Sequence, residues 1–269
     1  AWRDAFVFRN EEAGEFWMLL TARRGAGVPE KRRGCVAVAA SKDLKTWSMR
    51  DPLWAPDLYD THECPDLFKM GDWWYLVYSS YSGYWATHYR MARSLKGPWQ
   101  APPDDLFEGN AFYAAKTAGD GQRRYICGWV TNRQDEKEDA NWMWGGNMVI
   151  HEILQRPDGT FGVRMPEGVK GLFKTGVKMT PKPVVGKWKI DEAACSTVSV
   201  GRFSAIGLGA MPNPCMIEVT VTPESKTSRC GVMVRTNETL ESGYMISLDP
   251  AGQRMTFDRW PRPVSSWPS

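Results

Sequence analysis

The segment 62–68, His-Glu-Cys-Pro-Asp-Leu-Phe, places an acidic side chain between a histidine and a Cys-Pro bend. Glu63 leads directly into a short apolar run, and an aromatic segment follows at 73–75. Burial among such groups disfavours the charged form of a carboxyl group and so raises its pKa. A general acid needs a raised pKa to keep its proton near neutral pH. Glu63 is therefore a candidate proton donor. The alternative interpretation is that Glu63 is a turn residue before a strand.

A second acidic residue occupies a similar context upstream. Asp4 follows Arg3 and precedes an apolar run that ends at Phe8, much as Glu63 precedes its own run. Two copies of one layout favour a functional interpretation over two unrelated turn residues. Asp4 is therefore the second candidate carboxyl group of a site, with Arg3 beside it.

Four further residues are candidate neighbours of these carboxyl groups. Cys64 is expected to pack beside Glu63 and tune its acidity, because no histidine with an orienting acid is placed to make the thiol a nucleophile. Trp144 is expected in a loop before a strand, where it can stack on a sugar ring or fill the core. Tyr113 and Lys116 are candidate pocket residues, because strand alternation turns Tyr113 away from its apolar neighbour.

The elements that position these residues recur with a period of roughly 50 to 60 residues, the range of β-propeller blades. Each unit begins with a short apolar strand, at 4–8, 63–68 and 110–114. An aromatic strand follows after a turn, at 16–20, 73–78 and 125–129, and a third strand is expected at 35–41 and 88–94. The residue types favour strands throughout. Three units are fewer than a closed ring needs.

A second β region follows the repeat. Residues 166–189 are rich in Pro, Gly and Lys and are expected to form a linker. Alternating segments typical of sandwich strands occur at 195–200, 215–221, 230–235, 244–248 and 254–257. The sequence therefore predicts an all-β chain: propeller blades over 1–165, incomplete at the N-terminus, the linker, and a β-sandwich over 190–269, incomplete at the C-terminus.

Composition excludes several function classes. The net charge is only +3, from 34 basic and 31 acidic residues, so nucleic acid is not an expected partner. No apolar run approaches the roughly 20 residues that span a bilayer, so no membrane association is expected. The 14 Trp, 9 Tyr and 10 Phe suit both a packed β core and platforms for sugars.

The cysteines and histidines indicate neither a metal site nor a bound cofactor. Six cysteines show no CxxC pair and no regular spacing, and the chain has three histidines. Unpatterned cysteines favour a reducing compartment, although secretion stays open. The sequence predicts no oligomeric state.

These motifs resemble those of glycoside hydrolase family 32, the β-fructofuranosidases and fructan hydrolases. The segment 2–4 resembles the family's Arg-Asp-Pro motif, and 62–68 resembles its Glu-Cys-Pro motif. Further segments are similar to later blades and to part of the C-terminal sandwich: 87–90, 97–99, 112–117, 128–129 and 257–260. The two motifs in order, one blade apart, are the specific part of the resemblance.

The resemblance implies a five-bladed propeller followed by a β-sandwich, and a retaining enzyme that cleaves β-fructofuranosidic bonds. The implied substrates are sucrose or fructans, including inulin, levan and fructo-oligosaccharides. Carried over from the family motifs, Glu63 is the acid/base, Asp4 stabilises the transition state and Arg3 orients the substrate. Hydrogen bonds to ring hydroxyls that strengthen as oxocarbenium character develops fit this chemistry.

Two departures from the family pattern affect these expectations. Ala5 stands where the family motif has proline, and no Asn-Asp-Pro-Asn-Gly segment carries a nucleophile. Asp60, Asp72 and Asp105 lie in loops or turns and are expected to be structural, so we expect the nucleophile in upstream blades that this sequence does not include. Two alternatives follow: an inactive or carbohydrate-binding relative, and a five-bladed glycosidase acting on arabinose- or xylose-containing glycans.

Overall fold

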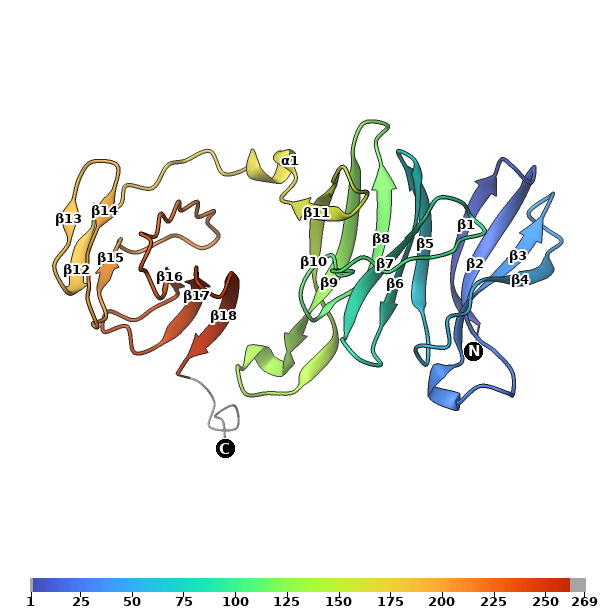
Figure 1. Ribbon diagram of the computed structural model, residues 1–269, viewed down its shortest axis with the longest axis horizontal. Coiled ribbons are helices and arrows are strands. Elements are labelled where there is room, and N and C mark those ends of the chain that lie inside the picture. The colour runs from blue at the N-terminus through green and yellow to red at the C-terminus, as the bar shows by residue number, and fades with distance from the viewer. Residues whose placement is uncertain (1, 262–269) are drawn as a thin grey trace. The chain divides into compact units, whose positions relative to one another are not determined.

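The computed structural model describes residues 2–261, which are almost entirely β-strand and loop (Figure 1). The chain divides into two compact units, Ala1–Lys170 and Gly171–Ser269. The division falls within the segment 166–189 that the sequence predicts as a linker. Three short helical turns are described, η1 (Glu30–Arg32), η2 (Gln134–Glu136) and α1 (Glu167–Lys170).

The first unit contains three antiparallel sheets in which strands adjacent in sequence are also neighbours in the sheet (Figure 1). The first sheet is formed by β1 (Arg3–Asn10), β2 (Glu15–Arg23), β3 (Gly34–Ser41) and β4 (Ser48–Trp54). The second is formed by β5 (Glu63–Met70), β6 (Trp73–Ser80) and β7 (Ala86–Ala92). The third is formed by β8 (Phe112–Gly119), β9 (Arg124–Arg133), β10 (Trp142–Gln155) and β11 (Phe161–Arg164). This up-and-down order is that of propeller blades.

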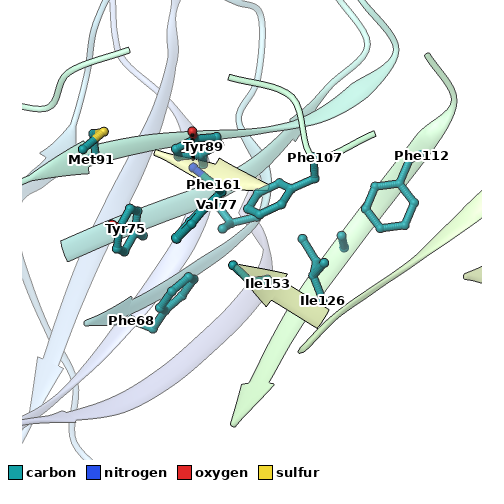
Figure 2. Packing of buried hydrophobic residues seen from close by; sticks show 11 residues of the cluster. Phe68, Tyr75, Val77, Tyr89, Met91, Phe107, Phe112, Ile126, Ile153 and Phe161 are labelled. Atoms are coloured by element: carbon teal, nitrogen blue, oxygen red, sulfur yellow. Dashed lines mark hydrogen bonds between the residues drawn. The ribbon is translucent and has the colours of Figure 1, made fainter. Parts of the chain in front are cut away.

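The middle sheet is buried on both faces, and the alternation of β6 explains why. Tyr75 and Val77 point to one side, while Leu76 between them points to the other, as the two-residue period of a strand requires. Tyr75 and Val77 belong to an aromatic core shared with the third sheet, which includes Phe112 and Phe161 (Figure 2). Leu76 belongs to a second core, shared with β2 and β3 of the first sheet.

These two cores fix the first strands of the three sheets side by side. β5 lies against β1 on one side and against β8 on the other. β5 itself contributes to both cores, because Leu67 joins the first-sheet core and Phe68 joins the aromatic core. The strands that carry the candidate site residues Arg3, Glu63 and Tyr113 are therefore neighbours in space.

The described part of the second unit contains three small antiparallel sheets. β12 (Lys182–Val185) pairs with β15 (Ala205–Gly207), and β13 (Lys189–Ile190) pairs with β14 (Cys195–Ser196). β16 (Cys230–Val234), β17 (Gly243–Asp249) and β18 (Arg254–Trp260) form a three-stranded meander. The strands expected at 230–235, 244–248 and 254–257 are thus confirmed.

Two of the expected strands of the second region are wrong. Residues 215–221 lie in no strand, and only Cys195–Ser196 of the segment 195–200 is in one. Alternation makes a segment suitable for a sheet, but a strand also needs a partner edge for its backbone hydrogen bonds. Ile217 and Val219 are half exposed, so their apolar side chains have no sheet face to cover. In the described part of the chain, no helix is long and apolar enough to cross a membrane.

Candidate active site

The first strand of each of the three sheets carries the same irregularity. In each of β1, β5 and β8, two residues stand opposite one residue of the neighbouring strand. These irregularities lie between Arg3 and Phe6, Glu63 and Asp66, and Tyr113 and Lys116. The residue that follows the start of each bulge has left-handed backbone: Asp4 with φ 59°, Cys64 with φ 51° and Ala114 with φ 53°. A bulge of this kind bends the strand and redirects side chains. Arg3, Glu63 and Tyr113 are thus equivalent positions in three repeats.

Glu63 lies between the other two equivalent residues. Arg3 donates a hydrogen bond from Nη2 to Glu63 Oε1, and the Tyr113 hydroxyl donates to Glu63 Oε2. The Glu63 residue is only 7% exposed, so its carboxylate is held by two donors with little water around it. The hydrogen bond to Glu63 raises the pKa of Arg3, while burial raises the pKa of Tyr113. Both donors therefore keep their protons at neutral pH.

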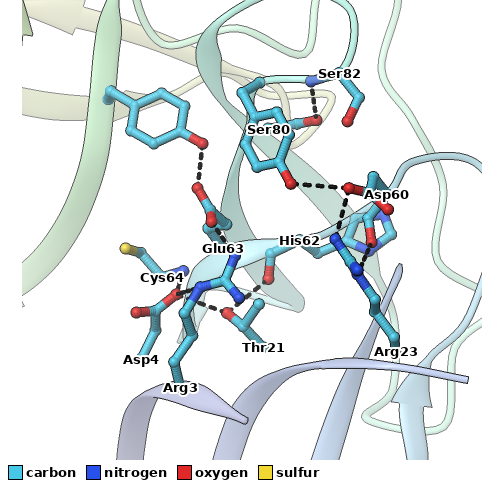
Figure 3. A network of polar contacts seen from close by, with 12 residues as sticks. Arg3, Asp4, Thr21, Arg23, Asp60, His62, Glu63, Cys64, Ser80 and Ser82 are labelled. Atoms are coloured by element: carbon cyan, nitrogen blue, oxygen red, sulfur yellow. Dashed lines mark hydrogen bonds and ion pairs between the residues drawn. The ribbon is translucent and has the colours of Figure 1, made fainter. Parts of the chain in front are cut away.

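Asp4 is fixed by the neighbouring strands (Figure 3). Its Oδ2 lies 2.9 Å from Thr21 Oγ1 and accepts a hydrogen bond of 3.1 Å from the Cys64 backbone N–H. Arg3 Nε lies 3.6 Å from the same oxygen. Thr21 Oγ1 is also 3.1 Å from the His62 carbonyl, which connects this carboxylate to the residue before Glu63. Sequence reasoning missed Thr21, whose only signal is its position opposite Arg3 in the ladder.

A pocket of about 260 Å³ opens over these groups. One end is polar and the other aromatic, and its lining residues are Arg3, Asp4, Glu63, Cys64, Tyr113, Ala114, Trp129 and Trp144. Five of the predicted site residues, Arg3, Asp4, Glu63, Tyr113 and Trp144, line this pocket together with the predicted neighbour Cys64. A pocket with two carboxyl groups, an arginine and aromatic walls is suited to binding and cleaving a sugar.

The two remaining predicted residues differ in position, because Cys64 lines the pocket and Lys116 does not. Burial raises the pKa of the Cys64 thiol to about 11, so the thiol is neutral at physiological pH and is a poor nucleophile. Lys116 Nζ donates a hydrogen bond of 2.7 Å to the Pro65 carbonyl and is not among the residues lining the pocket. Burial lowers the pKa of Lys116. Its expected role in substrate binding, and the tuning role of Cys64, stay predictions.

At the aromatic end of the pocket, Trp144 meets two rings to which the sequence analysis assigned no site role: Trp129, which lines the pocket, and Trp85, which does not. Trp144 lies within β10, not in the loop that was expected, and 67% of its surface is exposed. Its ring lies 5.4 Å from that of Trp129 and 5.2 Å from that of Tyr113, while Trp85 stacks on it at 5.4 Å. Trp129 stands opposite Tyr113 in the β8–β9 ladder, which is the signal that identifies it. Trp85 lies in the connection just before β7 and has no such local signal.

The aspartates that were expected to be structural are engaged in contacts away from the pocket lining. Asp60 is buried and accepts hydrogen bonds from Arg23 at 2.6 Å and from the Tyr81 hydroxyl at 2.9 Å (Figure 3). Asp105 pairs with His88 and Arg90, while Asp72 is exposed beside Arg93. Among residues 2–261, no group of three or more His, Cys, Asp or Glu side chains is arranged to hold a metal ion.

The first unit has the architecture of β-propeller blades, and its pocket combines carboxyl groups with aromatic walls. The model of the glycosyl hydrolases family 32 N-terminal domain matches residues 1–160, which is more than half of the chain. The chain belongs to glycoside hydrolase family 32. The resemblance drawn from the two motifs is thereby confirmed.

Relatives from this family match with modest identity. The sucrose-6-phosphate hydrolase and the raffinose invertase of Escherichia coli are each 25% identical, over 210 and 207 residues respectively. Each match covers 71% of this chain and 42% of the relative. The chain thus spans less than half the length of these relatives.

Solved structures agree on the fold. The exo-inulinase of Aspergillus awamori aligns with a TM-score of 0.60 at 16% identity, covering 96% of this chain and 51% of that one. A Bombyx mori GH32 beta-fructofuranosidase, solved as a mutant in complex with sucrose, aligns with a TM-score of 0.53 at 19% identity, covering 68% and 41%. The predicted fold class, an all-β chain of propeller blades followed by a β-sandwich, is confirmed.

Proposed function

We propose that the protein hydrolyses β-fructofuranosidic bonds with retention of configuration. The observation that carries the proposal is the position of Glu63, a buried carboxylate held between Arg3 and Tyr113 in a pocket that also contains Asp4. Membership of family 32 supports the same chemistry. The substrate is a fructose-containing oligosaccharide or polysaccharide, in keeping with the names of the E. coli relatives.

Glu63 is proposed as the general acid and base. In the first step its proton passes to the leaving-group oxygen, and in the second step its carboxylate takes a proton from the attacking water. Two donors aimed at separate carboxylate oxygens fix the orientation of the group before substrate arrives. A positioned acid of this kind contributes typically 10²–10⁴-fold to rate.

Asp4 is proposed to hold the hydroxyl groups of the fructosyl ring. One of its oxygens, Oδ2, is occupied by Thr21 and the Cys64 N–H, so its orientation is set by the protein. A fixed carboxylate can accept hydrogen bonds from ring hydroxyls, which become stronger donors as positive charge develops on the ring. Arg3, beside both carboxylates, orients them relative to each other.

Retention requires a further carboxylate, which attacks the anomeric carbon. Of the described residues that line the pocket, only Asp4 and Glu63 carry carboxyl groups, and both have other roles in this proposal. A mechanism-based fructosyl inhibitor that traps the covalent intermediate, followed by peptide mass spectrometry, identifies the attacking residue. Labelling of Asp4 itself would reassign its role.

The proposed function is tested by following sucrose and inulin hydrolysis with the full-length protein. We expect release of fructose, with the β-anomer formed first when the reaction is followed by NMR. First formation of the α-anomer would contradict retention. Binding of fructans without any release of fructose would favour the alternative of a carbohydrate-binding relative.

A further inference from the structure

We propose that Trp85 is a positioning residue, which holds the rings of Trp144 and Trp129 as a platform for the leaving-group sugar. The site therefore favours fructosides whose leaving group is itself a sugar ring. This inference rests on the proposed function and adds to it a specificity determinant outside the pocket lining.

The pocket has two chemically different ends, and Glu63 stands between them. Its Oε1 faces Arg3, next to Asp4, while its Oε2 faces Tyr113, whose ring contacts Trp129 and Trp144. The glycosidic oxygen that receives the proton joins two sugar units, so the two units lie on either side of Glu63. With the fructosyl ring at the Asp4 end, the leaving group lies at the aromatic end.

Trp85 contacts each of the other aromatic rings at this end of the site. It stacks nearly parallel on Trp144, at 5.4 Å and 8°, and meets the rings of Trp129 and Tyr113 edge-on at 5.8 and 6.0 Å. These are the separations and orientations that aromatic pairs prefer. Trp85 is absent from the pocket lining, yet it contacts all three aromatic rings that line the pocket.

Trp144 needs such support because its own backbone is held poorly by the sheet. The β9–β10 ladder is interrupted between Trp142 and Gly146, and Gly145 next to Trp144 has a φ of 103°. Trp144 is 67% exposed, and within its own sheet it meets the rings of Tyr113 and Trp129 at 64° and 71°, so Trp85 is the ring that lies parallel to it. A flat ring behind it leaves the opposite face free for the apolar C–H face of a sugar.

Trp85 is itself anchored on two sides. It immediately precedes β7 of the middle sheet, and its carbonyl accepts a hydrogen bond of 2.6 Å from the backbone N–H of Ala111, just before β8. Nearby in the same connection, the Tyr81 hydroxyl donates to the buried Asp60. The segment 81–85 thus joins the middle sheet to the rings of the third sheet.

The test compares two fructosides in the full-length protein. Sucrose has a sugar leaving group that reaches the aromatic end, whereas methyl β-D-fructofuranoside has one that does not. We expect Trp85→Ala to lower kcat/KM for sucrose by about tenfold, the upper end of what aromatic pairs contribute. The kcat/KM for the methyl fructoside should change by less than about twofold. Trp85→Phe, which keeps a flat ring, should restore most of the lost rate. Trp188→Ala, in the second unit, serves as the control.

Two results would overturn the inference. An equal loss for both substrates would mean that Trp85 supports Glu63 or the fold, and no loss for either would mean that the platform is not used. If Trp85→Ala does not fold, Trp144→Ala makes the same comparison, because its exposed ring leaves no internal cavity.

Failure of the proposed function is distinguishable from failure of this inference. Wild-type protein that releases no fructose from either compound contradicts the proposed function alone. In that case the same pair of ligands is compared by binding, using NMR titration of the wild type and Trp85→Ala. The inference predicts weaker binding of sucrose only, and unchanged binding of both ligands would contradict it.

Discussion

The backbone N–H of Cys64 donates a 3.1 Å hydrogen bond to Oδ2 of Asp4, a residue 60 positions earlier in the chain. Both residues occupy the left-handed position of a bulge, one in β1 and the other in β5. The two candidate carboxyl groups are therefore set relative to each other by backbone geometry as well as by the Arg3 side chain. Residues that sit in strained conformations beside a pocket are typical of functional sites.

The first prediction concerns Asp4. Asp4→Asn should lower kcat by about 100-fold or more with little change in KM, as expected for a group whose interaction strengthens in the transition state. Asparagine tolerates left-handed backbone, and its side-chain oxygen can still accept from Thr21, so the fold should persist. Asp57→Asn is the matched control, because Asp57 also has a positive φ, of 58°, but is not among the residues lining the pocket. Comparable losses of kcat in both variants would contradict the role of Asp4.

The second prediction concerns Tyr113. Tyr113→Phe removes the hydroxyl that donates to Glu63 Oε2 while leaving the ring in its aromatic contacts. We expect kcat to fall about tenfold, because one of the two hydrogen bonds that hold the Glu63 carboxyl group is lost and the group can rotate. Steady-state kinetics with Tyr125→Phe as control measures this, since the Tyr125 hydroxyl bonds only to Asp120, at 3.3 Å, among the described contacts. Wild-type kcat in Tyr113→Phe would show that the hydroxyl does not position Glu63.

The third prediction concerns the buried His62. Burial, together with the charges of Arg90 and His88, lowers the pKa of His62 to about 3. The unfolded chain binds a proton near the ordinary value of about 6.5 and the folded protein does not, so stability is complete above pH 6.5. It should decline by about 1.4 kcal/mol per pH unit as the pH falls from there towards 3.

Urea unfolding at several pH values checks this prediction. His62→Gln replaces the ring with a neutral polar side chain that does not titrate. The dependence on pH between 6.5 and 4 should be shallower in His62→Gln than in the wild type, whatever the variant's own stability at pH 7. Parallel curves for the two proteins would show that His62 titrates equally in the folded and unfolded states.

The fourth prediction concerns the bulge of β8. Ala114 has a φ of 53°, which costs a residue with a Cβ roughly 1–2 kcal/mol, while its neighbour Ala115 is fully buried in the core. Ala114→Gly relieves this strain and should be neutral or slightly stabilising. Ala115→Gly should destabilise by about 1 kcal/mol or more, since glycine lowers strand stability. Thermal unfolding of both variants compares them, and an equal loss would contradict the strained bulge.

Much of the first unit could be predicted from the sequence, because strand periodicity is carried by residues close together in the chain. The apolar runs after Arg3 and Glu63 and the aromatic run from Trp73 to Tyr78 have strand periodicity, and strands are found at each. The correspondence between the repeats that the sequence suggests is wrong by one residue. The interpretation from sequence equated Asp4 with Glu63, whereas the bulges equate Arg3 with Glu63 and Asp4 with Cys64.

What could not be predicted depends on contacts between sheets. Trp85 precedes β7 in sequence but stacks on Trp144 of another sheet, and no short-range pattern encodes that contact. The segment 215–221 shows the opposite error, since it has the alternation of a strand but lies in none. Strand periodicity indicates which residues suit a sheet, while the partner is decided by the rest of the fold.

The rate of fructose release by Glu63→Gln tests the role of Glu63 as acid and base most directly. Glutamine keeps the size of the side chain but cannot donate and accept the proton in turn, so we expect kcat for sucrose to fall by about 10²–10⁴-fold with an unchanged circular dichroism spectrum. Glu12→Gln, an exposed substitution of the same kind, should retain wild-type activity. Wild-type activity in Glu63→Gln would contradict the assignment of Glu63 as the acid and base.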